Sequence, residues 1–149
     1  MLAIDSVRSM KRTVFITALS SCFVCTALAG GEPIKDAPSV LRLASGKQVK
    51  VLSITRTTLR ASDEPALSLQ YVTDISISDT EKLYCEAEQV WAAFRPIAER
   101  EKVHAAVVTA NEPASGFLSM SKGAGWAWKQ RADGSWGPPD ETDQARVPK

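Results

Sequence analysis

The most regular alternation of apolar and polar residues lies between residues 66 and 78, where the sequence reads ALSLQYVTDISIS. Every second residue from Leu67 to Ile77 is apolar or threonine, whereas most of the residues between them are polar or small. In a β-strand, successive side chains point to opposite faces of the sheet. The pattern therefore predicts a strand over 66–78 with one buried face and one solvated face.

Two further strands are predicted upstream, near 40–43 and over 48–59, because both segments are rich in β-branched residues and a Ser-Gly pair separates them. In the longer segment the apolar residues change parity between Val51 and Leu52. A β-bulge inserts one extra residue and so turns the following side chains to the other face. We expect either such a bulge or burial of both faces at this point.

A helix is predicted directly after the regular strand. Ser78 and Glu81 have the spacing of a capping box, which marks the N-terminus of a helix. Pro96 has no backbone N–H, so the helix is expected to kink or to end near Phe94. Charged residues, Glu86 among them, are assigned to the polar sides of this helix. The apolar residues recur at intervals of three and four and form one stripe: Leu83, Ala87, Val90, Trp91, Phe94, Ile97 and Ala98.

The C-terminal part of the domain is predicted to form strands. Residues 103–110 are apolar on both parities, which is typical of a strand covered on both faces. Residues 116–131 are predicted as the next strand, which is interrupted or bulged at Gly123 and Gly125. The Asp-Gly dipeptide at 133–134 is a hairpin turn signal, and it introduces a short return strand.

These elements together predict an α+β fold with the order β-β-β-α-β-β. In this two-layer arrangement, one amphipathic helix packs across one face of a mostly antiparallel sheet. A single domain is expected over 39–137, preceded by an extended leader at 30–38 that contains two glycines and two prolines. Residues 138–149 begin with two prolines and are rich in charge, so they are predicted to be a disordered tail.

The N-terminal segment has the features of a secretory signal over residues 1–29. Lys11 and Arg12 precede an apolar stretch over 13–26, and a small-x-small sequence ends at Ala29. A positive start, a short apolar core and small residues at the cleavage site define such a signal. We therefore predict translation from Met10, cleavage after Ala29, and a mature protein that is periplasmic or secreted.

Two alternatives stay open for this segment. Leu19-Ser20-Ser21-Cys22 resembles a bacterial lipobox, whose cysteine carries a lipid that anchors the protein in the envelope. The apolar residues that follow Cys22 count against this alternative, because lipobox signals turn polar there. A retained membrane helix over 13–30 is just long enough to span a bilayer, but its serines and threonines dilute its apolar character.

The composition limits the partners and the cysteine chemistry. The chain has 18 basic and 17 acidic residues, and this balance does not suggest nucleic-acid binding, which calls for a basic face or stripe. Cys22 and Cys25 form a C-x-x-C pair, but both lie inside the apolar stretch, so no redox or metal role is predicted for them. Cleavage after Ala29 would leave only Cys85, which excludes an internal disulfide.

Catalytic and metal-binding residues are not predicted. His104 is the only histidine and lacks the companion residues of a zinc site, so neither a metal nor another cofactor is expected. The pattern places His104 on a face of the predicted strand 103–110. A thiol enzyme would need Cys85 to be activated by a base such as His104. No nucleophile or nucleotide-binding motif accompanies Cys85, so this thiol-dependent hydrolase is kept only as an alternative.

The tryptophans are the candidate ligand-binding residues. Trp126 and Trp128 share one parity of their strand, and Trp136 lies just across the predicted turn. Indoles on one face provide a flat surface for a sugar, a peptide or a partner protein. If this face instead packs under the helix and against Trp91, the same indoles belong to the core.

The sequence thus favours an exported bacterial protein of the periplasm or envelope that is non-enzymatic and acts by binding or as an accessory subunit. Its partner is expected to be a protein or an envelope component, not a nucleic acid. No stable membrane span is expected after signal cleavage. The alternatives are the hydrolase that uses Cys85 and His104, and a lipoprotein anchored through Cys22.

Overall fold

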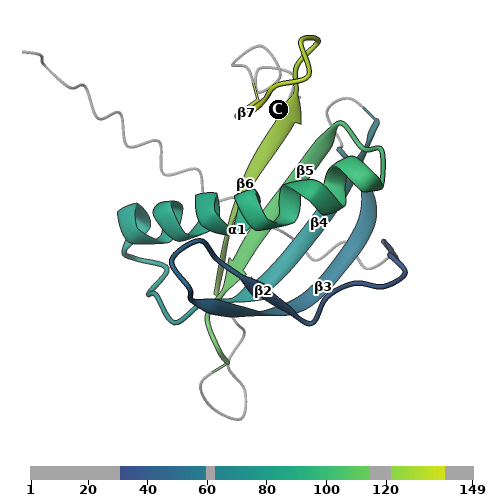
Figure 1. Cartoon of the computed structure of the whole chain (residues 1–149). Coiled ribbons are helices and arrows are strands. Elements are labelled where there is room, and N and C mark those ends of the chain that lie inside the picture. Colours follow the sequence, from purple (N-terminus) through teal and green to yellow (C-terminus); the bar gives the residue numbers. More distant parts are fainter. Residues whose placement is uncertain (1–30, 60–62, 115–121, 140–149) are drawn as a thin grey trace, which may run out of the picture.

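A computed structural model of the chain describes residues 31–59, 63–114 and 122–139. The predicted signal peptide and the predicted tail from residue 140 onward lie outside the described residues. One helix lies across one face of the strands (Figure 1), which confirms the two-layer α+β fold. The elements are β1 (Glu32–Pro33), β2 (Val40–Arg42), β3 (Gln48–Leu59), β4 (Glu64–Val72), α1 (Thr80–Arg100), β5 (Ala105–Asn111), β6 (Gly123–Gln130) and β7 (Trp136–Gly137).

The sheet has the order β1-β3-β4-β5-β6-β7, and β2 pairs with the part of β3 that precedes the β1 pairing. Only β4 and β5 run parallel among the paired strands of the described residues. A parallel pair needs a long crossover connection, and α1 provides it. The crossover lays α1 over the sheet face that carries the apolar side chains of both strands.

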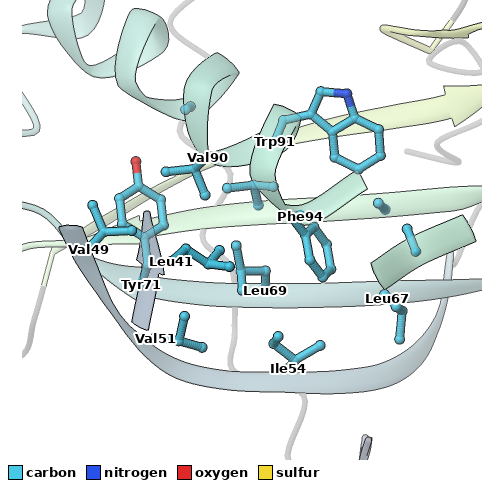
Figure 2. Packing of buried hydrophobic residues seen from close by; sticks show 14 of the residues in the cluster. Leu41, Val49, Val51, Ile54, Leu67, Leu69, Tyr71, Val90, Trp91 and Phe94 are labelled. Atoms are coloured by element: carbon cyan, nitrogen blue, oxygen red, sulfur yellow. The ribbon is translucent and has the colours of Figure 1, made fainter. Parts of the chain in front are cut away.

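The core lies between α1 and this face of the sheet. Phe94 reaches from α1 toward Leu67 and Leu69 of β4, as Figure 2 shows, and all three side chains are fully buried. The predicted apolar stripe of the helix faces the core. Its member Ile97 is partly buried and packs against the core, and the other members are buried: Leu83, Ala87, Val90, Trp91, Phe94 and Ala98.

The strand predicted over 66–78 ends earlier, at Val72. The Thr73 N–H still donates to the Asn111 carbonyl, but the Thr73 hydroxyl then accepts a hydrogen bond of 3.1 Å from the Ile75 N–H. Such side-chain bonds to the backbone compete with strand pairing and turn the chain. Ile75 and Ile77 nevertheless pack against the core. The alternation therefore predicted correctly that these two residues face the core, although they do not belong to the strand.

The irregularities predicted in two strands have different outcomes. The register of β3 against β4 shifts between Val51 and Ser53, which is the first of the two alternatives that the change of parity left open. The interruption or bulge predicted at Gly123 and Gly125 is wrong for residues 123–130, because β6 pairs with β5 in a continuous register there. Residues 116–121 of that predicted strand lie outside the described residues. Glycine at position 125 instead avoids a tight contact with β5, since an added Cβ would lie 3.3 Å from the Thr109 hydroxyl oxygen.

Part of the segment predicted as an extended leader takes part in the sheet. Within this segment, Glu32 and Pro33 form β1 and pair with β3 at Arg56 and Thr55. Gly31 lies so close to β3 that an added Cβ would approach the Arg56 carbonyl oxygen to 2.6 Å. A glycine is therefore required there by packing.

The predicted N-cap of the helix needs correction, and so does the alternative in which the helix ends at Pro96. Asp79, not Ser78, is the N-cap, and its carboxylate accepts from the Lys82 N–H. The helix also continues through Pro96 to Arg100. Pro96 leaves the Ala92 carbonyl without its usual N–H donor, but both residues are exposed, so water can hydrate that carbonyl.

Candidate functional site

The predicted tryptophan site is built around Trp91 of α1. The Trp128 ring stacks on Trp91 with ring centroids 5.1 Å apart and planes 10° from parallel. Trp91 and Trp128 are only 8% and 7% exposed. Trp128 therefore belongs to the core, as the alternative interpretation of its face expected.

The β6–β7 hairpin brings Trp136 into contact with Trp91. Its turn forms as predicted: Gly134 has a φ of +82°, and the Asp133 carboxylate accepts a 2.9 Å hydrogen bond from the Ser135 N–H. Register then sets Trp136 opposite Gln130. The centroid of its ring lies 4.9 Å from that of Trp91, so Trp136 is a half-buried neighbour of the stacked pair.

Trp126 lies two residues before Trp128 and is less buried. Its ring centroid is 6.2 Å from that of Tyr84, with the planes tilted by 59°. Tyr84 itself is 42% exposed. Partial burial, followed by the hydrogen bond to Glu88, raises the pKa of Tyr84, so its hydroxyl keeps its proton near neutral pH. We call Tyr84, Trp126 and Trp136 the aromatic shelf.

A second cluster surrounds Glu86, which is only 5% exposed. Its carboxylate accepts a 2.6 Å hydrogen bond from the Thr73 hydroxyl and forms an ion pair with Lys47 of the β2–β3 loop. Lys47 also pairs with the exposed carboxylate of Asp74. The hydrogen bond from Lys47 lowers the pKa of Asp74, and the two carboxylates raise the pKa of Lys47 although its burial opposes this.

This cluster is not among the predicted sites, because Glu86 is counted with the charged residues on the polar sides of the helix. A signal was present: Glu86 follows Leu83 by three residues and precedes Val90 by four, so it lies on the apolar stripe. A charge at such a position predicts a buried ion pair, because an unpaired buried carboxylate is strongly disfavoured. Its partners come from segments distant in sequence and could not be named.

An open cleft of about 690 Å³ lies beside Glu86. It runs between α1 and the β2–β3 loop, which rises beside the N-terminal half of the helix (Figure 1). The side chains around it include Leu43, Ile75, Cys85 and Gln89. Because Thr73 and Lys47 already occupy the oxygens of Glu86, this carboxylate ties the loop to the helix and is not available as a general base.

His104 lies elsewhere and is exposed, not on a strand face as predicted. It precedes β5, and its Nδ1 lies 2.7 Å from the Gln130 side-chain oxygen. A smaller cleft of about 400 Å³ lies beside it and includes the ion pair between Glu64 and Lys129, at 3.3 Å.

Cys85 and His104 therefore do not form the dyad of the alternative hydrolase. Cys85 is in the second turn of α1, whereas the Val103 N–H donates to the Ala98 carbonyl just after the helix ends. The helix rises 1.5 Å per residue, so about 20 Å separate Cys85 from Ala98 along its axis. The thiol and the imidazole lie on different clefts near opposite ends of the helix.

Comparison with protein-family models, with curated proteins and with solved structures finds no match to this chain. Across 31–59, 63–114 and 122–139, the acidic, cysteine and histidine side chains form no group that could hold a metal ion. In the same part of the chain, α1 falls short of the apolar length that a membrane-spanning helix needs.

Proposed function

We propose that this protein is exported to the periplasm or envelope of a bacterium and acts there by binding, as an accessory protein without enzymatic activity. The basic pair, apolar stretch and small residues before Gly30 support export. The expected partner is a protein or another envelope component.

The observation that carries the proposal is the contact between Tyr84 and Trp126. Both rings are partly accessible, and the buried stack of Trp91 and Trp128 supports the same flank of the molecule. Aromatic side chains held rigidly at a surface bind apolar ligand groups at a low cost in conformational entropy. Of the three predicted indoles, Trp126 and Trp136 supply this surface and Trp128 supports it from beneath.

Capture of partners from periplasmic and membrane fractions tests the binding role. The immobilised mature protein should retain a defined component, and Trp126→Ala and Tyr84→Ala should each weaken its retention. Leu52→Ala is the matched control, because Leu52 is also an exposed apolar residue, at 49%, but lies on β3 far along the sheet from β6. Equal retention by all variants, each shown to unfold cooperatively, would reject the aromatic shelf as the binding surface.

The intact mass of the protein recovered from the producing cell tests export. A mass matching Gly30–Lys149 is expected. A diacylglyceryl adduct on Cys22 would establish the lipid-anchored alternative, and an uncleaved chain in the cytoplasm would contradict export.

A further inference from the structure

Strand β6 leaves part of its outer edge unpaired within the described residues. The Gln130 N–H donates to the His104 carbonyl, and the Glu112 N–H donates to the Lys122 carbonyl. Residues that bond to an antiparallel neighbour alternate along a strand. Even-numbered residues of β6 therefore bond to β5, while Gly123, Gly125 and Ala127 direct their N–H and C=O groups away from it.

This edge lacks the usual protection against pairing. Natural sheet edges carry charges, prolines or bulges that keep other strands away. The stretch from Gly123 to Trp128 has no charged residue and no proline, and its register against β5 is regular. Strand β7 already pairs with the same edge at Lys129 and Gln130, and the chain bends away at Pro138.

We propose that a second copy of this chain pairs antiparallel with β6 through a two-fold axis at Gly125. Gly125 then lies opposite the partner's Gly125, and Gly123 lies opposite the partner's Ala127. All three residues direct their backbone groups outward, so this register satisfies each N–H and each C=O of the three.

Side-chain sizes favour the same register. On the face that carries α1, the large Trp126 would lie opposite the partner's Ala124, so a large residue meets a small one on both sides of the axis. The other face would bring together only glycine and alanine. Pairing centred on Gly125 also keeps both strands clear of β7, which occupies the edge from Lys129 onward.

The two helices would not collide. Helix α1 packs mainly on β5, and the β5 strands of the two copies would be three strand spacings apart, about 14 Å. Directly packed helices lie about 8–10 Å apart, so a groove remains between them. Trp126 and the partner's Trp126 would be diagonal neighbours on its floor, which would join the two aromatic shelves into one surface.

Sedimentation at a series of protein concentrations tests the dimer. The mass of the wild-type protein should rise toward twice that of the monomer. Ala127→Pro removes one outward donor per copy at an edge position that tolerates proline in the monomer, and it should weaken association by about tenfold or more.

Thr58→Pro is the matched control on the opposite edge of the sheet. The Ile54 carbonyl accepts a hydrogen bond from the Ile34 N–H, which follows β1. The even-numbered residues in this part of β3 therefore direct their backbone N–H and C=O groups away from β4. Thr58 is exposed and lies beyond the β1 pairing. This variant should associate like the wild type.

Amide hydrogen exchange tests the register without a mutation, and so covers the case in which Ala127→Pro does not fold. The amides of Gly125 and Ala127 should be protected at high concentration and should exchange faster on dilution. The amides of Trp126 and Trp128, which bond to β5, should stay protected throughout. A monomer at every concentration, or a dimer in which the Gly125 and Ala127 amides exchange freely, would overturn the proposal. Neither result would bear on the binding role proposed above.

Discussion

The rings of Trp91 and Trp128 lie parallel within 10° and stack at 5.1 Å, which joins α1 to β6. Trp136 contacts the same Trp91 ring at 4.9 Å. One helix residue therefore holds the last two strands of the sheet against the core, and the partly exposed Trp126 lies on this supported strand.

The stacking of Trp128 on Trp91 predicts that Trp128 contributes strongly to the free energy of unfolding. Trp128→Ala should lower the free energy of unfolding by about 3–5 kcal/mol, because it leaves a cavity beneath Trp91. Urea denaturation measures this change. Trp126→Ala, on the same face but partly exposed, should cost clearly less. If Trp128→Ala keeps wild-type stability, Trp128 is not a core residue.

The ion pair of Lys47 with Glu86 predicts a strong coupling between the two residues. Lys47→Met should destabilise the protein by about 1–3 kcal/mol, because it leaves a buried carboxylate without its cation. The value is below that of a fully buried pair, since Lys47 is 35% exposed. The double variant Lys47→Met/Glu86→Met should recover much of the loss in a double-mutant cycle.

Lys82→Met is the control for this cycle. Lys82 pairs with Asp79 at the surface and is 75% exposed, and exposed pairs contribute little. Additive effects of Lys47→Met and Glu86→Met would show that the two residues are not coupled.

Tyr71 predicts a loss of stability at alkaline pH. Its side chain is fully buried, and this burial, followed by the charge of Glu86, raises the pKa of Tyr71. An unfolded tyrosine ionises near pH ~10. Above that pH the unfolded chain releases a proton that the folded protein keeps, so the free energy of unfolding should fall as pH rises.

Urea denaturation at several pH values between about 8 and 11 measures this dependence. Tyr71→Phe should make the free energy of unfolding vary less with pH over that range. Tyr84→Phe is the control, and its effect should be smaller because Tyr84 is 42% exposed whereas Tyr71 is fully buried. An alkaline slope that survives unchanged in Tyr71→Phe would contradict the assignment.

The N-terminus of α1 predicts that replacing Asp79 destabilises the protein, whereas replacing the adjacent Ser78 does not. Asp79→Ala should lower the denaturation midpoint, because the carboxylate that accepts from the Lys82 N–H is lost. Ser78→Ala should leave the midpoint unchanged, since the Ser78 hydroxyl is bonded to Ser76 and not to the helix. The reverse result would restore Ser78 as the cap, as the spacing to Glu81 first suggested.

The local pattern of apolar residues was sufficient to predict an element when that element buries one side of its segment. The strand predicted over 48–59 coincides with β3, and the helical stripe around Val90 and Phe94 is the buried one. A period of two or of 3.6 residues reports directly which side of the chain avoids water. The sequence therefore determined the fold class and the turn that leads to Trp136, and it located the irregularity after Val51, which the structure resolves as a shift in register.

Contacts between distant segments were decided by the tertiary structure. The crossover through α1 made β4 and β5 parallel and brought Lys47 to Glu86. The position of Trp91 buried Trp128 and left Trp126 partly exposed, although the two share one parity. Periodicity assigns a residue to a face, but the element that covers that face depends on strand register and helix placement, which no local stretch of sequence encodes.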